Sequence, residues 1–252
     1  MGKKFILYFL LCLASVHYLH AQERVTTFGL QVKPIIPIQF FDAGKQEQSV
    51  NNIDYIVNPK LGMSFGMVIR KGFTNSLSLE TGINFLRRNY DLTINDADSS
   101  FSGTSQFRLL TYEIPVLGLV YVRINRQLYM NAAGGISFDI YPTPLFTADT
   151  YFTNSIARTS WLQPSLLANV GWEYRTESSG YFYFGASLHR PFQKIYTEYI
   201  KYEGESGFRN EKAIFELTGN YITIDFRYFF HEDPEKRKKK TKKEPKVKGA
   251  SR

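Results

Sequence analysis

Residues 60–70 read KLGMSFGMVIR, and every second side chain in this stretch is large and apolar. The apolar positions are Leu61, Met63, Phe65, Met67 and Ile69. Successive side chains of a β-strand point to opposite faces, so the stretch predicts a strand with one apolar face and one polar face. The apolar face suits hydrocarbon, and the polar face suits water or a polar interior.

The same alternation recurs along most of the chain. It marks eight segments, at about 25–40, 55–70, 75–90, 106–122, 127–141, 161–175, 180–190 and 213–230. Long connections, at 41–54, 91–105, 142–160 and 191–212, alternate with short ones at 71–75, 123–126 and 176–179. This layout predicts an all-β fold: an eight-stranded antiparallel up-and-down transmembrane β-barrel with short periplasmic turns and long outer loops. An even strand number puts both chain ends on the periplasmic side.

Charged residues of both signs recur on the polar face of the predicted strands. They form a candidate lumen charge network of Lys33, Arg70, Glu80, Glu113, Asp139, Glu173, Asp225 and Arg227. The opposite face carries no charge, which favours contact with lipid. A water-soluble barrel of eight strands would reverse these faces and point its apolar side chains inward. In the membrane reading, the inward charges satisfy one another and have a structural role.

The two ends of the chain differ from its body. Residues 1–21 hold Lys3 and Lys4, an apolar run and a terminal Ala21, which is the layout of a signal peptide. The one cysteine, Cys12, lies in this leader, so the mature chain has neither a disulfide nor a thiolate metal site. The predicted domains are therefore a signal peptide (1–21), an outer-membrane barrel (22–230) and a tail (231–252).

The tail carries most of the net charge of +8. It contains ten of the 31 Lys and Arg residues and four of the 23 Asp and Glu residues, whereas residues 22–230 contain 19 of each. The neutral body gives no reason to expect a nucleic-acid partner. The tail has little apolar surface, so we predict a disordered basic tail in the periplasm. It is either solvated without a partner or attached to anionic lipid, cell-wall carboxylates or an acidic envelope protein.

Residues 110–118, LTYEIPVLG, place Glu113, Ile114 and Pro115 in the middle of a predicted strand. This stretch, together with GLQVKP at 29–34 and the closing strand 221–230, resembles the PorT-like outer-membrane β-barrel family of Bacteroidetes. The resemblance covers about 25–230. It implies an integral protein of the bacterial outer membrane, and the namesake of the family is associated with type IX secretion and gliding.

The last predicted strand ends in alternating aromatic residues, Phe226, Tyr228 and Phe230. They resemble the signal by which barrel-assembly machinery recognises a closing strand. We therefore expect outer-membrane lipid as the surroundings of the barrel and the assembly machinery as a partner during biogenesis.

The leading functional hypothesis is a non-enzymatic interaction, envelope or secretion-associated component that acts through its loops and tail. An eight-stranded barrel has a side-chain-filled interior, which disfavours a general porin. One alternative is an outer-membrane hydrolase that uses Ser187 and His189, two residues apart on one strand face. Another is a narrow specific pore or a ligand-binding barrel. The sequence holds no nucleotide-binding or metal-binding motif, so we expect no cofactor and no metal.

Overall fold

A computed structural model describes residues 26–39, 43–74, 76–142, 144–148, 151–176, 179–204 and 210–230. The predicted signal peptide and the predicted basic tail lie outside these described residues. Among the described residues, no helix is long and apolar enough to cross a membrane.

The described residues form thirteen β-strands, and every strand pairing is antiparallel. The strands are β1 (Thr26–Ile36), β2 (Gln46–Val50), β3 (Ile53–Gly72), β4 (Leu77–Asp96), β5 (Phe101–Arg123), β6 (Leu128–Ile140), β7 (Leu145–Ala148), β8 (Phe152–Arg158), β9 (Leu162–Arg175), β10 (Tyr181–Pro191), β11 (Tyr196–Tyr202), β12 (Glu211–Leu217) and β13 (Tyr221–Phe229). The all-β, antiparallel prediction is confirmed.

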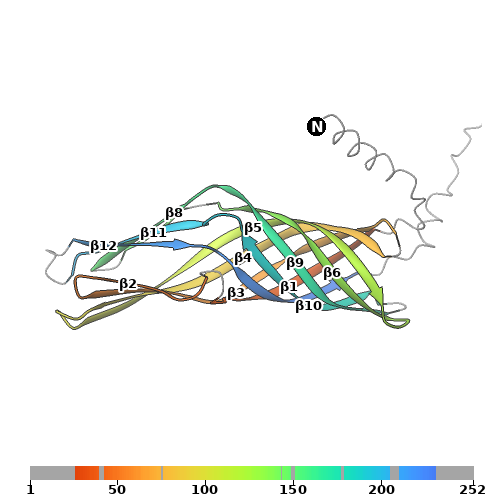
Figure 1. Ribbon diagram of the computed structural model, residues 1–252, viewed down its shortest axis with the longest axis horizontal. Coiled ribbons are helices and arrows are strands. Elements are labelled where there is room, and N and C mark those ends of the chain that lie inside the picture. The colour runs from red at the N-terminus through yellow and green to blue at the C-terminus, as the bar shows by residue number, and fades with distance from the viewer. Residues whose placement is uncertain are drawn as a thin grey trace, which may run out of the picture.

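A closed ring of strands forms the barrel. Its order is β1, β13, β10, β9, β6, β5, β4 and β3, and β1 also pairs with β3. For example, Gly29 pairs with Phe229 on one side and with Val68 on the other. Short turns join β3 to β4, β5 to β6 and β9 to β10 at one end, which we call the turn end. The barrel fills the right half of Figure 1.

At the opposite end the strands continue into an extension (Figure 1, left). Its first sheet consists of β2 and the outer halves of β3, β4 and β5, and its second sheet has the order β12, β11, β8, β7. The two sheets are joined at one side, where the Gln46 side chain donates to the Glu216 carbonyl and Asn51 donates to Glu211. An apolar core lies between them.

The extension corrects the predicted strand count and the predicted outer loops. Thirteen strands replace eight, because three of the four predicted loops contain strands of their own: β2, then β7 and β8, then β11. The predicted loop at 91–105 shrinks to a turn at 97–100, since β4 and β5 both run past the barrel. The last predicted segment, 213–230, is divided between β12 and β13. Strands outside a membrane need no lipid-facing alternation, so the pattern used to find the barrel missed them.

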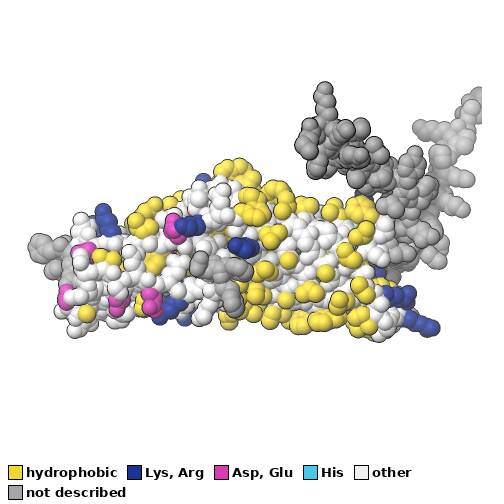
Figure 2. All heavy atoms as spheres, viewed as in Figure 1, with side chains coloured by type: hydrophobic (Ala, Val, Ile, Leu, Met, Phe, Trp, Pro, Cys, Tyr) yellow, Lys and Arg dark blue, Asp and Glu magenta, His cyan; other side chains and the backbone are white. Residues whose placement is uncertain are grey.

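The outer surface also separates barrel from extension. Large apolar side chains cover the barrel half in Figure 2, whereas charged side chains gather over the extension and at the turn end. Phe65 and Phe182, on opposite parts of the ring, are each more than half exposed. A broad apolar belt between two charged ends is the surface expected of a membrane-spanning barrel.

Candidate functional site in the barrel interior

All eight residues of the candidate charge network are buried inside the barrel. They lie on β1, β3, β4, β5, β6, β9 and β13, each at a position whose neighbours along the strand face outward. Their contacts divide them into two groups, one toward the turn end and one toward the extension.

The first group is a continuous ladder of ion pairs. The Arg70 guanidinium contacts Glu80 at 2.9 Å and Glu173 at 2.5 Å, and Arg175 contacts the other oxygen of Glu173 at 2.7 Å. Arg227 continues the ladder. Each carboxylate is held by at least one guanidinium, which is the arrangement that makes a buried charge tolerable.

Arg227 links Glu80 to the last strand. Its Nη1 lies 2.5 Å from Glu80 Oε1, and its Nη2 lies 2.7 Å from Asp225 Oδ2. The guanidinium also stacks over the ring of Tyr183, 4.6 Å from its centroid. Lys33 adds positive charge near both carboxylates. The ladder thus ties β3, β4, β9 and β13 together across the lumen.

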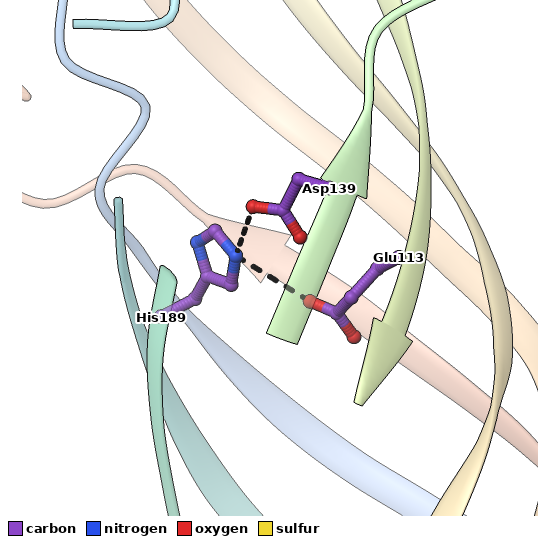
Figure 3. Close-up of side chains that lie close together, drawn as sticks. All are labelled: Glu113, Asp139 and His189. Atoms are coloured by element: carbon purple, nitrogen blue, oxygen red, sulfur yellow. Dashed lines mark hydrogen bonds and ion pairs between the residues drawn. The ribbon is translucent and has the colours of Figure 1, made fainter. Parts of the chain in front are cut away.

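The second group consists of Glu113, Asp139 and His189, one residue each from β5, β6 and β10 (Figure 3). His189 Nε2 lies 2.9 Å from Asp139 Oδ2 and 3.5 Å from Glu113 Oε2. The ring of Tyr221 stacks on the imidazole with centroids 4.4 Å apart, and its hydroxyl donates to Glu113. All three members of the cluster are buried.

These three side chains could hold a divalent metal. One ligand atom from each lies within 4.8 Å of the others, and imidazole nitrogen with carboxylate oxygen is a donor set that zinc accepts. The same atoms also satisfy one another directly through the bond between His189 and Asp139. The sequence motifs missed this cluster because its members come from three strands and are separated by tens of residues.

The structure does not bring Ser187 and His189 together as a nucleophile and its base. The Ser187 hydroxyl donates to Asp225 at 2.5 Å and accepts from Asn169 at 2.9 Å, whereas His189 bonds to Asp139. The Ser137 hydroxyl lies 3.4 Å from His189 Nε2. Both predicted catalytic side chains are buried, so this arrangement gives no support to the hydrolase hypothesis.

The two sequence signatures occupy different faces. Glu113 and Pro115 point into the lumen, and Ile114 between them is half-buried on the outside. In the closing strand, Phe226 and Phe230 are about half exposed on the apolar belt, and the ring of Tyr228 packs edge-on against Phe230. The aromatic signature is therefore part of the lipid-facing surface.

A buried carboxylate in the extension was missed by the sequence analysis because it lies in a segment predicted to be a loop. Glu198 on β11 is fully buried between the two sheets, where Phe215 and Ile156 are its partners in register. Asn154 donates to its Oε1 at 2.7 Å, and its Oε2 has no hydrogen-bond partner among the described residues. Burial raises the pKa of Glu198 to about 7.

One comparison with known proteins identifies the family of the chain. A family model described as "Outer membrane protein beta-barrel domain" matches residues 21–197. Among solved structures, the chain is similar to the β domain of the Bordetella autotransporter BrkA, with 8% identity, 83% of this chain and 100% of that chain covered, and a TM-score of 0.23. No curated protein matches the chain.

Proposed function

Because the chain belongs to the outer membrane protein beta-barrel domain family, we propose that this outer-membrane protein works by binding a partner and not by catalysis. The turn end faces the periplasm in this proposal, and the extension stands at the cell surface. The leader directs export, and the basic tail remains in the periplasm, where it can meet acidic envelope components. Barrel-assembly machinery is the partner during insertion.

The filled lumen supports a role without transport. The ion-pair ladder and the Glu113–Asp139–His189 cluster occupy successive levels of the interior. Side chains from opposite walls contact each other at both levels, Arg70 with Glu173 and Tyr221 with Glu113. A barrel of eight strands has little room beyond its own side chains. The protein then serves as a fixed support for the extension.

The observation that carries the proposal is a free strand edge in the extension. β5 pairs with β4 all the way to Phe101, but its pairing with β6 begins at Tyr112. Residues 101–111 therefore have a hydrogen-bonded neighbour on one side alone among the described residues. β7 is likewise the last strand of the second sheet. A free edge offers backbone N–H and C=O groups to an extended segment of another chain.

In a more specific form of the proposal, the chain belongs to the PorT-like group and works beside a secretion or envelope machine. The strand that contains Glu113, Ile114 and Pro115 supports it. In this form the partner is an envelope protein that contributes an extended segment to the edge of β5.

Site-specific photo-crosslinking in cells tests this proposal. A photoreactive phenylalanine analogue replaces Gln106, an exposed residue on the free half of β5, and in a second variant it replaces Asp91, which pairs with Gln106 from β4. β4 is hydrogen-bonded to β3 on one side and to β5 on the other, so it has no free edge at Asp91. Asp91 is therefore the matched control. We expect a discrete crosslinked partner from position 106 and a much weaker product from position 91. Equal products from both positions, or none from 106, would contradict the proposal.

Planar-bilayer recording of the purified barrel tests the filled lumen separately. We expect no regular conductance steps, because the ladder spans the interior. Well-defined, reproducible steps would show an open path and would favour the narrow-pore alternative.

A further inference from the structure

A small cavity opens in the wall where the barrel meets the extension. It lies between the end of β1, the β3 segment at Val57–Lys60, the middle of β4 and the turn between β12 and β13. Its volume is about 30 Å³. A space of this size holds a few water-sized atoms, or one small polar group.

The lining of the cavity combines two positively charged residues with apolar and uncharged polar ones. Arg88 and Lys60 are its charged residues, and no Asp or Glu is among the residues described around it. Apolar side chains form much of the remaining wall; they include Ile35, Pro37, Val57, Pro59 and Leu217. Lys60 reaches Asp91 at 3.0 Å on the outside and is half exposed, whereas Arg88 is buried.

Arg88 differs from the other buried arginines of the barrel. Arg70 and Arg227 each contact two carboxylates, but among the described residues no carboxylate lies within ion-pair distance of Arg88. Its Nη1 donates to the Gly219 carbonyl at 3.2 Å and its Nη2 to Thr111 at 3.1 Å. Its Nε has no hydrogen-bond partner in the described part of the chain. The charge of Asp139 acts on Arg88 only from beyond ion-pair distance, so among the described residues no anion is in direct contact with this buried guanidinium.

The turn between β12 and β13 is shaped around this guanidinium. Gly219 has a φ of +73°, and a Cβ built on it would lie 2.6 Å from Arg88 Nη1. Glycine is therefore required at this position both for the backbone conformation and for the close approach. The ring of Tyr221 faces the guanidinium from the next strand, 5.5 Å from its centroid.

We propose that this cavity binds a carboxylate carried on a short apolar stem, with the carboxylate at Arg88 and the stem along the apolar wall. Guanidinium and carboxylate match in charge and in planar geometry, and the Nε–H of Arg88 has no hydrogen-bond partner in the described part of the chain. Lys60 adds a second positive charge at the exposed side.

Isothermal titration calorimetry on the full chain in a neutral maltoside detergent tests the proposal, with butyrate, acetate and inorganic phosphate as probes. We expect butyrate to bind the wild-type protein, and Arg88→Gln to weaken that binding at least tenfold. Arg87→Gln is the matched control, because Arg87 is the adjacent residue on the outer face. It should bind butyrate as the wild type does. Empty micelles give the background heat.

Two further variants keep the test decisive if Arg88→Gln does not fold. Ala43→Trp fills the cavity from the loop before β2 and leaves Arg88 in place, so it should abolish butyrate binding. Lys60→Gln should weaken it several-fold. Heat-modifiable migration on gels shows whether each variant is folded.

The outcomes separate the sources of the ligand. Butyrate binding much tighter than acetate binding supports the proposal, whereas equal binding of the two acids would show that the apolar wall does not hold the stem and would overturn it. Phosphate binding in preference to both, or no binding by any probe at millimolar concentration, would overturn the proposal. So would butyrate binding that is unchanged in Ala43→Trp. None of these results depends on the partner proposed for the edge of β5.

Discussion

The barrel and the extension are built from the same strands, yet their faces are reversed. In the barrel half of β4, Glu80 points inward and Ile83 outward, whereas in the extension half Leu92 points inward and Asp91 outward. The alternation continues without interruption through the strand. Only the position of the apolar residues relative to the interior changes.

The reversal reflects the medium around each half. In the extension, water surrounds the outer face, so apolar burial between two sheets supplies the driving force. Around the barrel, the apolar belt contacts lipid hydrocarbon, which is also apolar. Burial of such side chains therefore contributes little free energy. Polar contacts inside the lumen and the closed set of backbone hydrogen bonds then hold the structure. Each half should therefore respond to a different class of substitution.

The largest effect is expected from Arg70→Ala in the lumen. This change leaves Glu80 and Glu173 with less counter-charge in a buried site, and breaking such a pair costs about 4 kcal/mol. Urea-induced unfolding from phospholipid vesicles measures the loss. Arg126→Ala, in the exposed turn between β5 and β6, is the control and should change stability by less than about 0.5 kcal/mol. A loss below about 1 kcal/mol for Arg70→Ala would show that the ladder does not hold the barrel.

The next largest effect is a dependence of the stability of the extension on pH, which Glu198 causes. The pKa of Glu198 is about 7 in the folded extension and 4.5 in its ordinary state. The stability that the protonated carboxyl contributes to the folded extension is therefore fully present below pH 4.5 and is lost as the pH rises through 7. At pH 8 the ionised carboxylate should cost about 3 kcal/mol. Glu198→Gln should remove this cost. Hydrogen exchange of the β8 and β11 amides, corrected for intrinsic rates, should then slow at pH 8 and remain unchanged at pH 4.5.

Glu47→Gln on β2 is the control for this experiment, because Glu47 is exposed. It should leave the exchange of β8 and β11 as it is in the wild type at both pH values. A Glu198→Gln variant that exchanges faster than the wild type at pH 8 would mean that the ionised carboxylate is stabilised in the extension.

The smallest of the three effects compares two positions on one strand. Val116→Arg puts a charge on the apolar belt and should destabilise the barrel in vesicles by about 2 kcal/mol. Gln106→Arg, ten residues earlier on the outer face of the extension, should change stability by less than about 0.5 kcal/mol. Equal losses of stability from the two substitutions would indicate that both positions contact the same medium.

The side chains that fill the barrel interior could be predicted from the sequence, because the alternation of strand faces applies to all of them. Once the apolar face of a strand is assigned to lipid, the period of two places every other side chain in the lumen. The same rule failed beyond the belt, where the assignment reverses. Tyr55 and Phe107 belong to the apolar core of the extension, in or beside segments where the analysis expected outer loops.

Two charged residues show where the pattern gives no answer. Arg88 lies an even number of residues from Glu80, so the period of two places Arg88 inward and Arg87 outward, but only the fold shows that no carboxylate among the described residues pairs with Arg88. From the sequence alone, Glu198 resembles any polar loop residue. Only the structure shows that β8 and β12 enclose it. The Glu113–Asp139–His189 cluster likewise depends on register between strands, which no single segment contains.

The closure of the ring by β1 has a consequence for the order of folding. The turn between β4 and β5 spans four residues, at 97–100, whereas Gly29 and Phe229 are 200 residues apart when they pair. Chain-closure entropy grows with the logarithm of loop length, which makes the second contact about 3 kcal/mol more costly to form. The long β4–β5 hairpin can form early and locally, while the seam between β1 and β13 forms last. Destabilising changes at that seam should therefore mainly speed unfolding, and equivalent changes in the hairpin should slow folding.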